Sequence, residues 1–158
     1  MNYSKLISIL RKKNKVNIIG PPGSGKTTLC EKVSKELKLD LIELDEILFD
    51  KNCNAMKNKN MIFLNQLISS PKCIVDGTYY SLVSQKRIEE TDLFVMLKIN
   101  FFKTFFRIIR RSIYKSDCKC AERFSFSLIK FLMTYYLYKK RLMIKLIPKN
   151  KLLIIKIN

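Results

Sequence analysis

Five short apolar runs alternate with longer segments of mixed character along the chain, and this alternation is the first clue to the fold. Each run is rich in Ile, Leu and Val and lacks the regular polar positions of a half-exposed strand, so each is predicted to be a buried β-strand. The predicted strands span residues 16–20, 37–44, 72–76, 93–99 and 151–157.

The segments between these runs have helical periodicity. After residue 25, Leu29, Val33 and Leu37 recur at four-residue spacing with charged residues between them, which indicates an amphipathic helix. The predicted helices span about 25–38, 58–69, 79–90, 101–115 and 124–147. Strands that alternate with helices are typical of a parallel sheet covered on both faces. The sequence therefore predicts an α/β three-layer sandwich with a five-stranded parallel sheet, formed by residues 1–158 as a single domain.

Glycine is rare in this chain, and three of its four glycines lie within six residues after the first predicted strand. The segment GPPGSGKT, residues 20–27, satisfies the phosphate-loop pattern G-x-x-x-x-G-K-[ST] at every fixed position. In such a loop the backbone N–H groups form a cradle for anions, and the following helix adds the positive end of its dipole. We therefore expect a nucleoside triphosphate site that uses ATP and Mg²⁺. The alternative is a glycine-rich turn that only begins a helix.

Each position of this loop has an expected role. Lys26 is expected to contact the β- and γ-phosphates, the Thr27 hydroxyl to ligate Mg²⁺, and Thr28 to meet the α-phosphate. The predicted nucleotide-binding residues are Gly20, Pro22, Gly23, Ser24, Gly25, Lys26, Thr27 and Thr28.

Two aspartates, Asp45 and Asp76, follow the second and third predicted strands, which we expect to flank the strand before the loop. Ligands gather at the carboxyl ends of strands in open parallel sheets, and an aspartate there typically holds Mg²⁺. Asp76 fits the metal role better, and Gly77 after it would let a substrate approach closely. Asp45 is then the candidate for orienting an acceptor hydroxyl or taking its proton. The alternative for both aspartates is a structural role as a helix cap or turn residue.

A third informative segment, residues 101–123, combines aromatic and basic residues. One predicted helix face carries Phe101, Phe102, Phe105, Phe106, Ile109 and Ile113, and the opposite side carries Lys103, Arg107, Arg110 and Arg111. Arginines on a mobile segment neutralise the charge that spreads over a transferred phosphoryl group. Arg107, Arg111 and Arg123 are therefore candidate catalytic residues of a short lid at about 107–123. The alternative is a core helix with a solvated basic face, which is the role we expect for Lys103.

The net charge of +18 is concentrated in the C-terminal part, where residues 101–158 carry fifteen Lys and Arg against Asp117 and Glu122. Such a basic region could contact nucleic acid or an anionic membrane surface. Lysine outnumbers arginine by 24 to 7, however, which is typical of the proteins of an AT-rich genome. Nucleic-acid binding therefore remains an open alternative.

Other features of the sequence limit its location and chemistry. No signal peptide and no segment long and uncharged enough to span a bilayer is found, so a cytoplasmic location is expected. The five cysteines are expected to be free thiols. Cys118 and Cys120 form a C-x-C pair, but no histidine or second cysteine pair completes a zinc site. Acid–base chemistry must then come from carboxylates, lysine or tyrosine.

Taken in order, these motifs resemble a known group. The segments IIGPPGSGKTTL, LIELDEILF, IVDGTYYSLVSQKRIEETDLFVML, RIIRRS and CAERF are similar to those of the adenylate kinase-like P-loop small kinases, and among them to the bacterial DNA topology modulation protein family. The resemblance covers residues 16–158 and implies a central phosphate-loop strand, a short lid, and ATP with Mg²⁺. By position it implies that Asp45 and Asp76 line the acceptor pocket and that Arg107, Arg111 and Arg123 belong to the lid. Unlike typical members, this chain has neither histidine nor tryptophan.

Two functions from different classes remain. The first is a kinase that moves the γ-phosphate of ATP to a small acceptor such as a nucleotide or nucleoside, as a monomer or homodimer. The second is an ATP-binding or ATP-hydrolysing regulatory protein that associates with nucleic acid through its basic C-terminal region.

Overall fold

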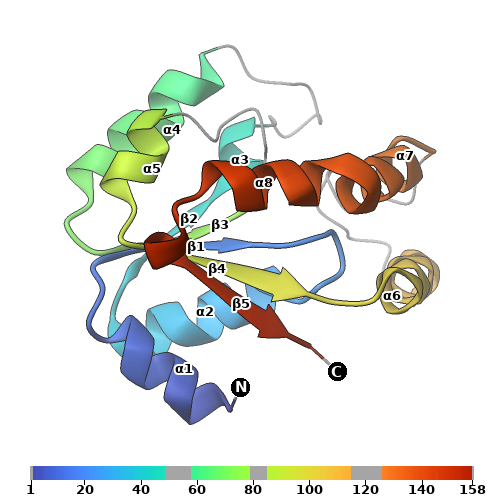
Figure 1. Cartoon of the computed structure of the whole chain (residues 1–158), viewed down its shortest axis with the longest axis horizontal. Coiled ribbons are helices and arrows are strands. Elements are labelled where there is room, and N and C mark those ends of the chain that lie inside the picture. The colour runs from blue at the N-terminus through green and yellow to red at the C-terminus, as the bar shows by residue number, and fades with distance from the viewer. Residues whose placement is uncertain (1, 49–57, 79–84, 115–125, 158) are drawn as a thin grey trace.

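The computed structural model describes residues 2–48, 58–78, 85–114 and 126–157 of the chain. A five-stranded parallel sheet lies at its centre (Figure 1). Its strands are β1 (Lys15–Ile19), β2 (Asp40–Glu43), β3 (Cys73–Asp76), β4 (Leu93–Lys98) and β5 (Leu152–Lys156). The five predicted strands and the parallel sheet are therefore confirmed.

The strand order is β2-β3-β1-β4-β5, which places the strand before the glycine loop in the middle of the sheet. β1 pairs with β3 and with β4, and Ile18 lies beside Asp76 in the first of these pairs. β2 pairs only with β3 among the described strands, where Glu43 lies beside Asp76. The prediction that the strand before Asp45 flanks β1 is therefore wrong, because β3 lies between them.

Helices fill the connections between the strands. They are α1 (Tyr3–Leu10), α2 (Lys26–Leu37), α3 (Leu44–Leu48), α4 (Lys59–Ser69), α5 (Gln85–Glu90), α6 (Phe101–Tyr114), α7 (Phe126–Thr134) and α8 (Lys140–Leu146). A π-helical turn, η3 (Tyr135–Lys139), joins α7 to α8, and a 3₁₀ turn, η4 (Lys149–Lys151), precedes β5. The predicted helices are confirmed within the described residues, whereas α1 and α3 were not predicted.

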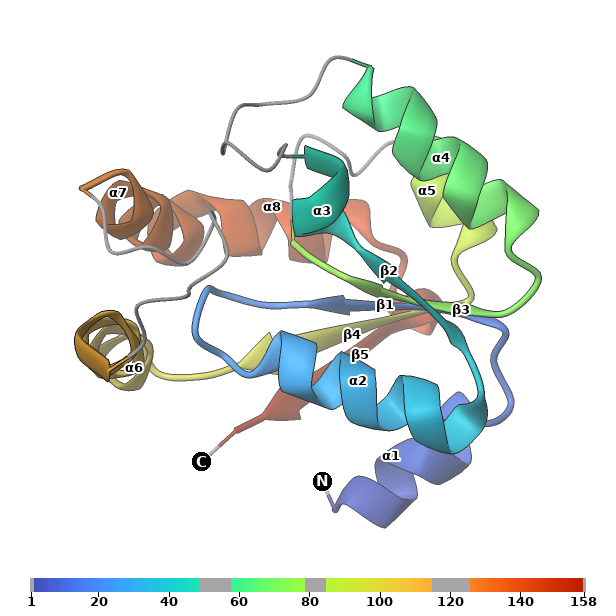
Figure 2. The ribbon, with the colours of Figure 1, turned by 180° about the vertical axis from the view of Figure 1, so that it is seen from behind.

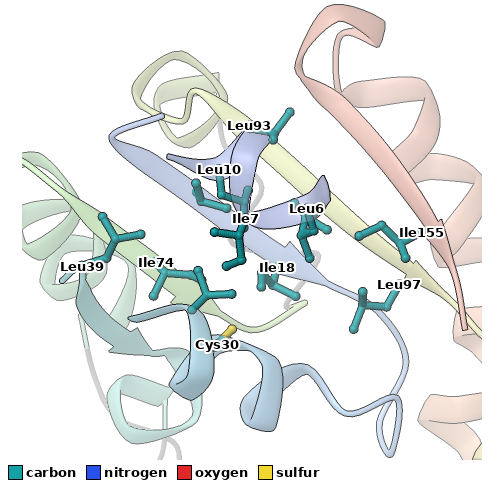
Figure 3. Packing of buried hydrophobic residues seen from close by; sticks show 13 residues of the cluster. Leu6, Ile7, Leu10, Ile18, Cys30, Leu39, Ile74, Leu93, Leu97 and Ile155 are labelled. Carbon is teal, nitrogen blue, oxygen red and sulfur yellow. The ribbon is translucent and has the colours of Figure 1, made fainter. Parts of the chain in front are cut away.

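These helices form two layers around the sheet. α1 and α2 cover one face, and α3, α4, α5 and α8 lie on the other (Figures 1 and 2). On the first face, Leu6, Ile7 and Leu10 of α1 pack with Cys30 of α2 and Ile18 of β1 in one buried cluster (Figure 3). Burying an aliphatic side chain of this size stabilises a fold by about 1.5–3 kcal/mol. α1 is therefore an integral part of the core.

The opposite face has its own clusters. Tyr135 of η3 and Met143 of α8 pack on Phe94 and Met96 of β4, while Phe63 of α4 belongs to a second cluster over β2 and β3. Each side of the sheet is thus buried, which explains why the strand sequences are continuously apolar.

Helix α6 packs differently from the prediction. Thr104 is fully buried and Ile108 is nearly so, but Phe102 and Phe106 are 67% and 66% exposed. The Thr104 hydroxyl donates to the Asn100 carbonyl oxygen at 3.1 Å and lies 3.0 Å from the Tyr136 hydroxyl. The predicted apolar face is therefore wrong for Phe102 and Phe106. The buried side of α6 therefore includes a polar residue, Thr104, together with Ile108.

Candidate functional site

The glycine loop connects β1 to α2 at the carboxyl edge of the sheet. Gly25 immediately precedes α2 with φ +86°, a left-handed conformation that glycine adopts at little cost. A Cβ atom built on Gly25 would meet no other atom within 4 Å. The space beside this residue is therefore open to a ligand, as the phosphate-loop interpretation requires.

The other glycines of the site are surrounded by protein. A Cβ atom on Gly23 would lie 3.2 Å from the Ile108 side chain and 3.4 Å from the Thr104 carbonyl oxygen of α6. A Cβ atom on Gly77 would lie 2.6 Å from Cδ1 of Leu44. We predicted that Gly77 allows close substrate approach, but the structure shows that it accommodates Leu44 at the start of α3.

Side chains that follow the loop converge on the end of β3. The Lys26 Nζ atom donates to the Pro21 carbonyl oxygen at 2.9 Å, which holds the ammonium group across the loop. The Thr27 hydroxyl donates to Oδ2 of Asp76 at 2.6 Å, and Asp76 is only 8% exposed. The structure thus brings together Thr27 and Asp76, as predicted from the motif and the strand end, while Lys26 lies across the loop.

The remaining loop residues differ in accessibility. Thr28 and Gly25 are exposed, while Gly20 and Ser24 are buried. The Ser24 Oγ atom has no hydrogen-bond partner within the described part of the chain, whereas its backbone N–H donates to the Pro21 carbonyl oxygen at 3.3 Å. The described loop is therefore a compact turn whose open side lies at its junction with α2.

Sequence reasoning missed Thr78, which anchors the start of the loop. Its hydroxyl accepts a hydrogen bond from the Gly20 N–H at 2.9 Å and donates one to the Gly20 carbonyl oxygen at 2.5 Å. The next link between these strands is the Gly77 N–H, which donates to the Ile18 carbonyl oxygen at 3.3 Å. Thr78 thus ties the exit of β3 to the exit of β1, and a threonine directly after the D-G pair was the available signal.

Sequence reasoning also missed Arg87 of α5, which supports the site through hydrogen bonds to β1 and to the residue after β3. Its guanidinium donates to Oδ1 of Asn17 at 2.5 Å and to the Gly77 carbonyl oxygen at 3.2 Å. The group lies 5.1 Å from the centre of the Phe63 ring, and Asn17 in turn donates to the Thr91 hydroxyl at 2.8 Å. Burial lowers the pKa of Arg87 to about 9, so the side chain remains charged at neutral pH. The signal in the sequence was Asn17, a polar residue in the apolar run of β1 that needs a buried hydrogen-bond partner.

Asp45 lies farther from the loop than predicted. It belongs to the first turn of α3, beyond the end of β2 at Glu43, and is half-buried. Because β3 separates β2 from β1, Asp45 is two strands away from the loop strand. Glu43, which we had not singled out, is the carboxylate that lies beside Asp76 in the strand register.

The predicted lid is described only in part. Arg107 lies on α6 with an exposed side chain, and Lys103 is exposed as expected. Arg111 lies within α6, but its side chain and the whole of Arg123 lie outside the described residues. Their catalytic roles therefore stay predictions.

The metal chemistry of the site follows from its donors. The described residues contain no group of three or more His, Cys, Asp or Glu placed to hold a metal ion. Mg²⁺ at phosphate sites needs only one or two protein oxygens, because substrate phosphates and water supply the rest. The hydroxyl of Thr27 and the carboxylate of Asp76 are oxygen donors of this kind, 2.6 Å apart, so the residues present fit Mg²⁺ with a phosphate ligand.

The two described cysteines, Cys30 and Cys73, are buried free thiols. Burial raises the pKa of Cys73 to about 11 and that of Cys30 well above its ordinary value. Neither is therefore a reactive thiolate at neutral pH. Cys53, Cys118 and Cys120 lie outside the described residues. Within the described part of the chain, no helix has the length and apolar character needed to cross a membrane.

Comparison with solved structures identifies the fold. A gluconokinase from Sinorhizobium meliloti 1021 superposes with a TM-score of 0.59 and 15% identity, over 91% of this chain and 82% of that one. A shikimate kinase from Acinetobacter baumannii, solved in complex with shikimate, superposes with a TM-score of 0.63 and 15% identity, over 96% and 88% of the two chains. The chain has the fold of the small P-loop kinases.

Sequence comparison adds less. The family described as Novel STAND NTPase 3 matches residues 1–71, which include the glycine loop but cover less than half of the chain. No curated protein matches the chain. The α/β P-loop fold predicted from the sequence is therefore confirmed, while identity at this level carries no statement about substrate.

Proposed function

We propose that this protein is a P-loop phosphotransferase that binds ATP with Mg²⁺ and moves its γ-phosphate to a small acceptor. The observation that carries the proposal is the contact between Thr27 and Asp76 at 2.6 Å. It joins the last residue of the phosphate-loop motif to the aspartate that ends the neighbouring strand, which is the arrangement that phosphate-loop enzymes use to hold a metal.

The proposed mechanism begins with binding of the triphosphate. The backbone N–H groups of the loop and the first turn of α2 face the phosphate oxygens, with Gly25 leaving room for their approach. Lys26 exchanges its hydrogen bond to the Pro21 carbonyl for contacts with the β- and γ-phosphates. Thr27 and Asp76 would hold Mg²⁺, which neutralises the charge that develops during phosphoryl transfer.

The transfer step requires an acceptor oxygen in line with the bond that breaks. The acceptor hydroxyl oxygen forms a bond to the γ-phosphorus while the bond from this phosphorus to the β–γ bridging oxygen breaks, so that ADP leaves. Asp45 is proposed to orient the acceptor hydroxyl and take its proton. Arg107, Arg111 and Arg123 are proposed to neutralise the transferred group from the lid at 107–123.

The finer assignments are also part of this proposal. The motifs support membership of the DNA topology modulation protein family, and we further propose a single domain, a monomeric or homodimeric state and a cytoplasmic location. The acceptor is a nucleotide, a nucleoside or a similar small molecule. The neighbouring structures are a gluconokinase and a shikimate kinase with shikimate, so hydroxy acids belong among the acceptors to be tested.

Phosphorus NMR of ATP turnover tests this function. The protein is mixed with ATP, Mg²⁺ and pooled acceptors: nucleoside monophosphates, nucleosides, sugars, gluconate and shikimate. We expect a new phosphorylated product, which disappears with Lys26→Ala but persists with Lys35→Ala, because Lys35 is an exposed lysine near the far end of the same helix. If no acceptor raises ATP consumption above the rate with water, the kinase proposal is wrong.

The family match over residues 1–71 is compatible with one second candidate, an NTPase that associates with nucleic acid. The charge of +18 supplies the required attraction to phosphates. This candidate predicts ATP hydrolysis that DNA or RNA accelerates and binding that weakens steeply with salt. A shallow salt dependence, or no acceleration by either polymer, would exclude it.

A further inference from the structure

A second feature adjoins the glycine loop: a groove between α1 and the end of the sheet. It has a volume of about 220 Å³. It is lined by Tyr3 and Leu6 of α1, Gly25 and Leu29 at the start of α2, Leu97 of β4, and Ile155 and Ile157 at the end of β5. Leu6, Leu97 and Ile155 lie side by side in Figure 3.

This groove borders the phosphate loop. Gly25 belongs to the loop and also lines the groove, and a Cβ atom built on it would meet no atom within 4 Å outside its chain neighbours and its own helix. Leu29 lies one helical turn beyond the loop. The end of β5 lies at the same end of α2 as the loop (Figure 2), whereas the Tyr3 hydroxyl of α1 reaches Glu36 near the other end of α2. A ligand that extends from the loop past α2 therefore enters the groove.

The chemistry of the groove selects which part of a nucleotide fits there. Its lining is aliphatic apart from Tyr3 and the Gly25 backbone, so it disfavours phosphates and a hydroxylated sugar. The base is the flat and least polar part of a nucleoside triphosphate. Tyr3 is 40% exposed, and its hydroxyl donates to Oε2 of Glu36 at 2.9 Å, which restrains the ring and leaves part of it accessible.

We propose that this groove receives the nucleobase, with Tyr3 of α1 as its stacking side chain. The inference rests on the proposed ATP-binding function and assigns a ligand-binding role to α1, a helix that precedes the phosphate-loop motif. Described lining residues other than Tyr3 carry no side-chain hydrogen-bonding group. The groove therefore recognises the shape of a purine and discriminates little between adenine and guanine.

Calorimetric titration with three ligands tests the groove separately from the loop. The ligands are ATP, GTP and inorganic tripolyphosphate, each with Mg²⁺. We expect ATP and GTP to bind more tightly than tripolyphosphate and within about tenfold of each other, because base stacking adds affinity that is independent of the hydrogen-bond pattern. Tyr3→Ala weakens both nucleotides by about tenfold or more and leaves tripolyphosphate unchanged.

Matched variants separate the possible failures. Tyr138→Ala removes a 62% exposed tyrosine from η3 on the other side of the sheet and should change none of the three affinities. If tripolyphosphate and ATP bind equally, or if Tyr3→Ala acts no more strongly than Tyr138→Ala, the groove proposal fails while the loop proposal stands. If tripolyphosphate does not bind, and Lys26→Ala changes nothing, the ATP-binding function itself fails and the groove proposal with it.

A measurement without substitution gives a second readout. In protein with labelled Leu and Ile methyl groups, the base protons of bound ATP should show nuclear Overhauser effects to Leu29 and Ile155, but not to Leu137. Leu137 is a control because it lies on η3 and is 71% exposed. Base contacts to other methyl groups in place of Leu29 and Ile155 would overturn the proposal.

Discussion

Replacing Thr78 with valine tests whether a single hydroxyl holds the start of the phosphate loop. Valine has nearly the same shape, so packing is retained while the hydroxyl is lost. This hydroxyl accepts a hydrogen bond from the N–H of Gly20 at 2.9 Å and donates one to its carbonyl oxygen at 2.5 Å, and Thr78 is 6% exposed. The substitution therefore strands two backbone groups in a site that water hardly reaches.

The expected cost follows from these two groups. Each buried polar group that loses its partner costs about 1–3 kcal/mol, so for the two groups we expect Thr78→Val to lower the free energy of unfolding by about 2–6 kcal/mol. That is a large share of the 5–15 kcal/mol typical of a domain, and it corresponds to a decrease in Tm of about 4–24 °C. Thr78→Ser keeps the hydroxyl and should cost about 1 kcal/mol or less.

Urea unfolding followed by far-ultraviolet circular dichroism measures this difference, since the chain has no tryptophan for fluorescence. The serine variant controls for the lost methyl group. A valine variant within about 0.5 kcal/mol of the serine variant would show that the Gly20 groups find other partners, and the proposed anchor would be wrong. The affinity for tripolyphosphate should fall together with stability, because the same bonds fix the first residue of the loop.

Three further changes test other parts of the site. Gly77→Ala places a Cβ atom 2.6 Å from Leu44 Cδ1 at φ +147°, so it should lower the free energy of unfolding in urea by about 3 kcal/mol or more. The control Gly25→Ala should cost about 1–2 kcal/mol, because only its φ angle is strained. Equal costs would contradict the packing role of Gly77. Arg87→Met leaves the acceptors of the buried guanidinium without a donor and should destabilise by about 2–4 kcal/mol, whereas a cost below about 1 kcal/mol would refute its supporting role. The pKa of Cys73 is raised from 9.0 to about 11 in the folded protein, so the native state binds more protons than the unfolded state between these pH values. The stability that the buried thiol contributes is complete below pH 9 and is lost as the pH rises through 11. Cys73→Ala should therefore reduce the fall in unfolding free energy between pH 9 and 11 by about 2–3 kcal/mol, and an unchanged pH profile would contradict the burial of this thiol.

Much of the fold could be predicted from local patterns in the sequence. Each strand is a continuous apolar run because both faces of the sheet are covered, and this pattern can be recognised without knowing the partners. α1 was missed although Leu6, Ile7 and Leu10 have helical spacing, because a helix of eight residues gives too short a pattern to stand out. Its stability comes from packing on the sheet, which sequence periodicity does not report.

The candidate site likewise has parts that local sequence patterns predict and parts that they do not. The loop could be predicted because its chemistry requires particular residue types at fixed spacing, and Asp76 because it ends an apolar strand. The positions of Asp45, Thr78 and Arg87 depend on which strands pair and on how α5 is placed, and these are non-local outcomes. Gly77 illustrates the limit, since its conformation was foreseen as special but its neighbour, Leu44, belongs to a distant segment.

The corrected strand order gives the proposed functions a spatial order along the carboxyl edge of the sheet. β5 and β4 end at the groove proposed for the base, β1 at the phosphate loop, β3 at Asp76, and β2 just before α3, which carries Asp45. A nucleotide with its base in the groove would extend along this row and direct its γ-phosphate toward Asp76. An acceptor would then have to enter from the β2 side. A second carboxylate next to β1 would compete with Asp76 for the metal, whereas a carboxylate on α3 would not. The position of Asp45 away from the loop strand is therefore consistent with its proposed contact with the acceptor.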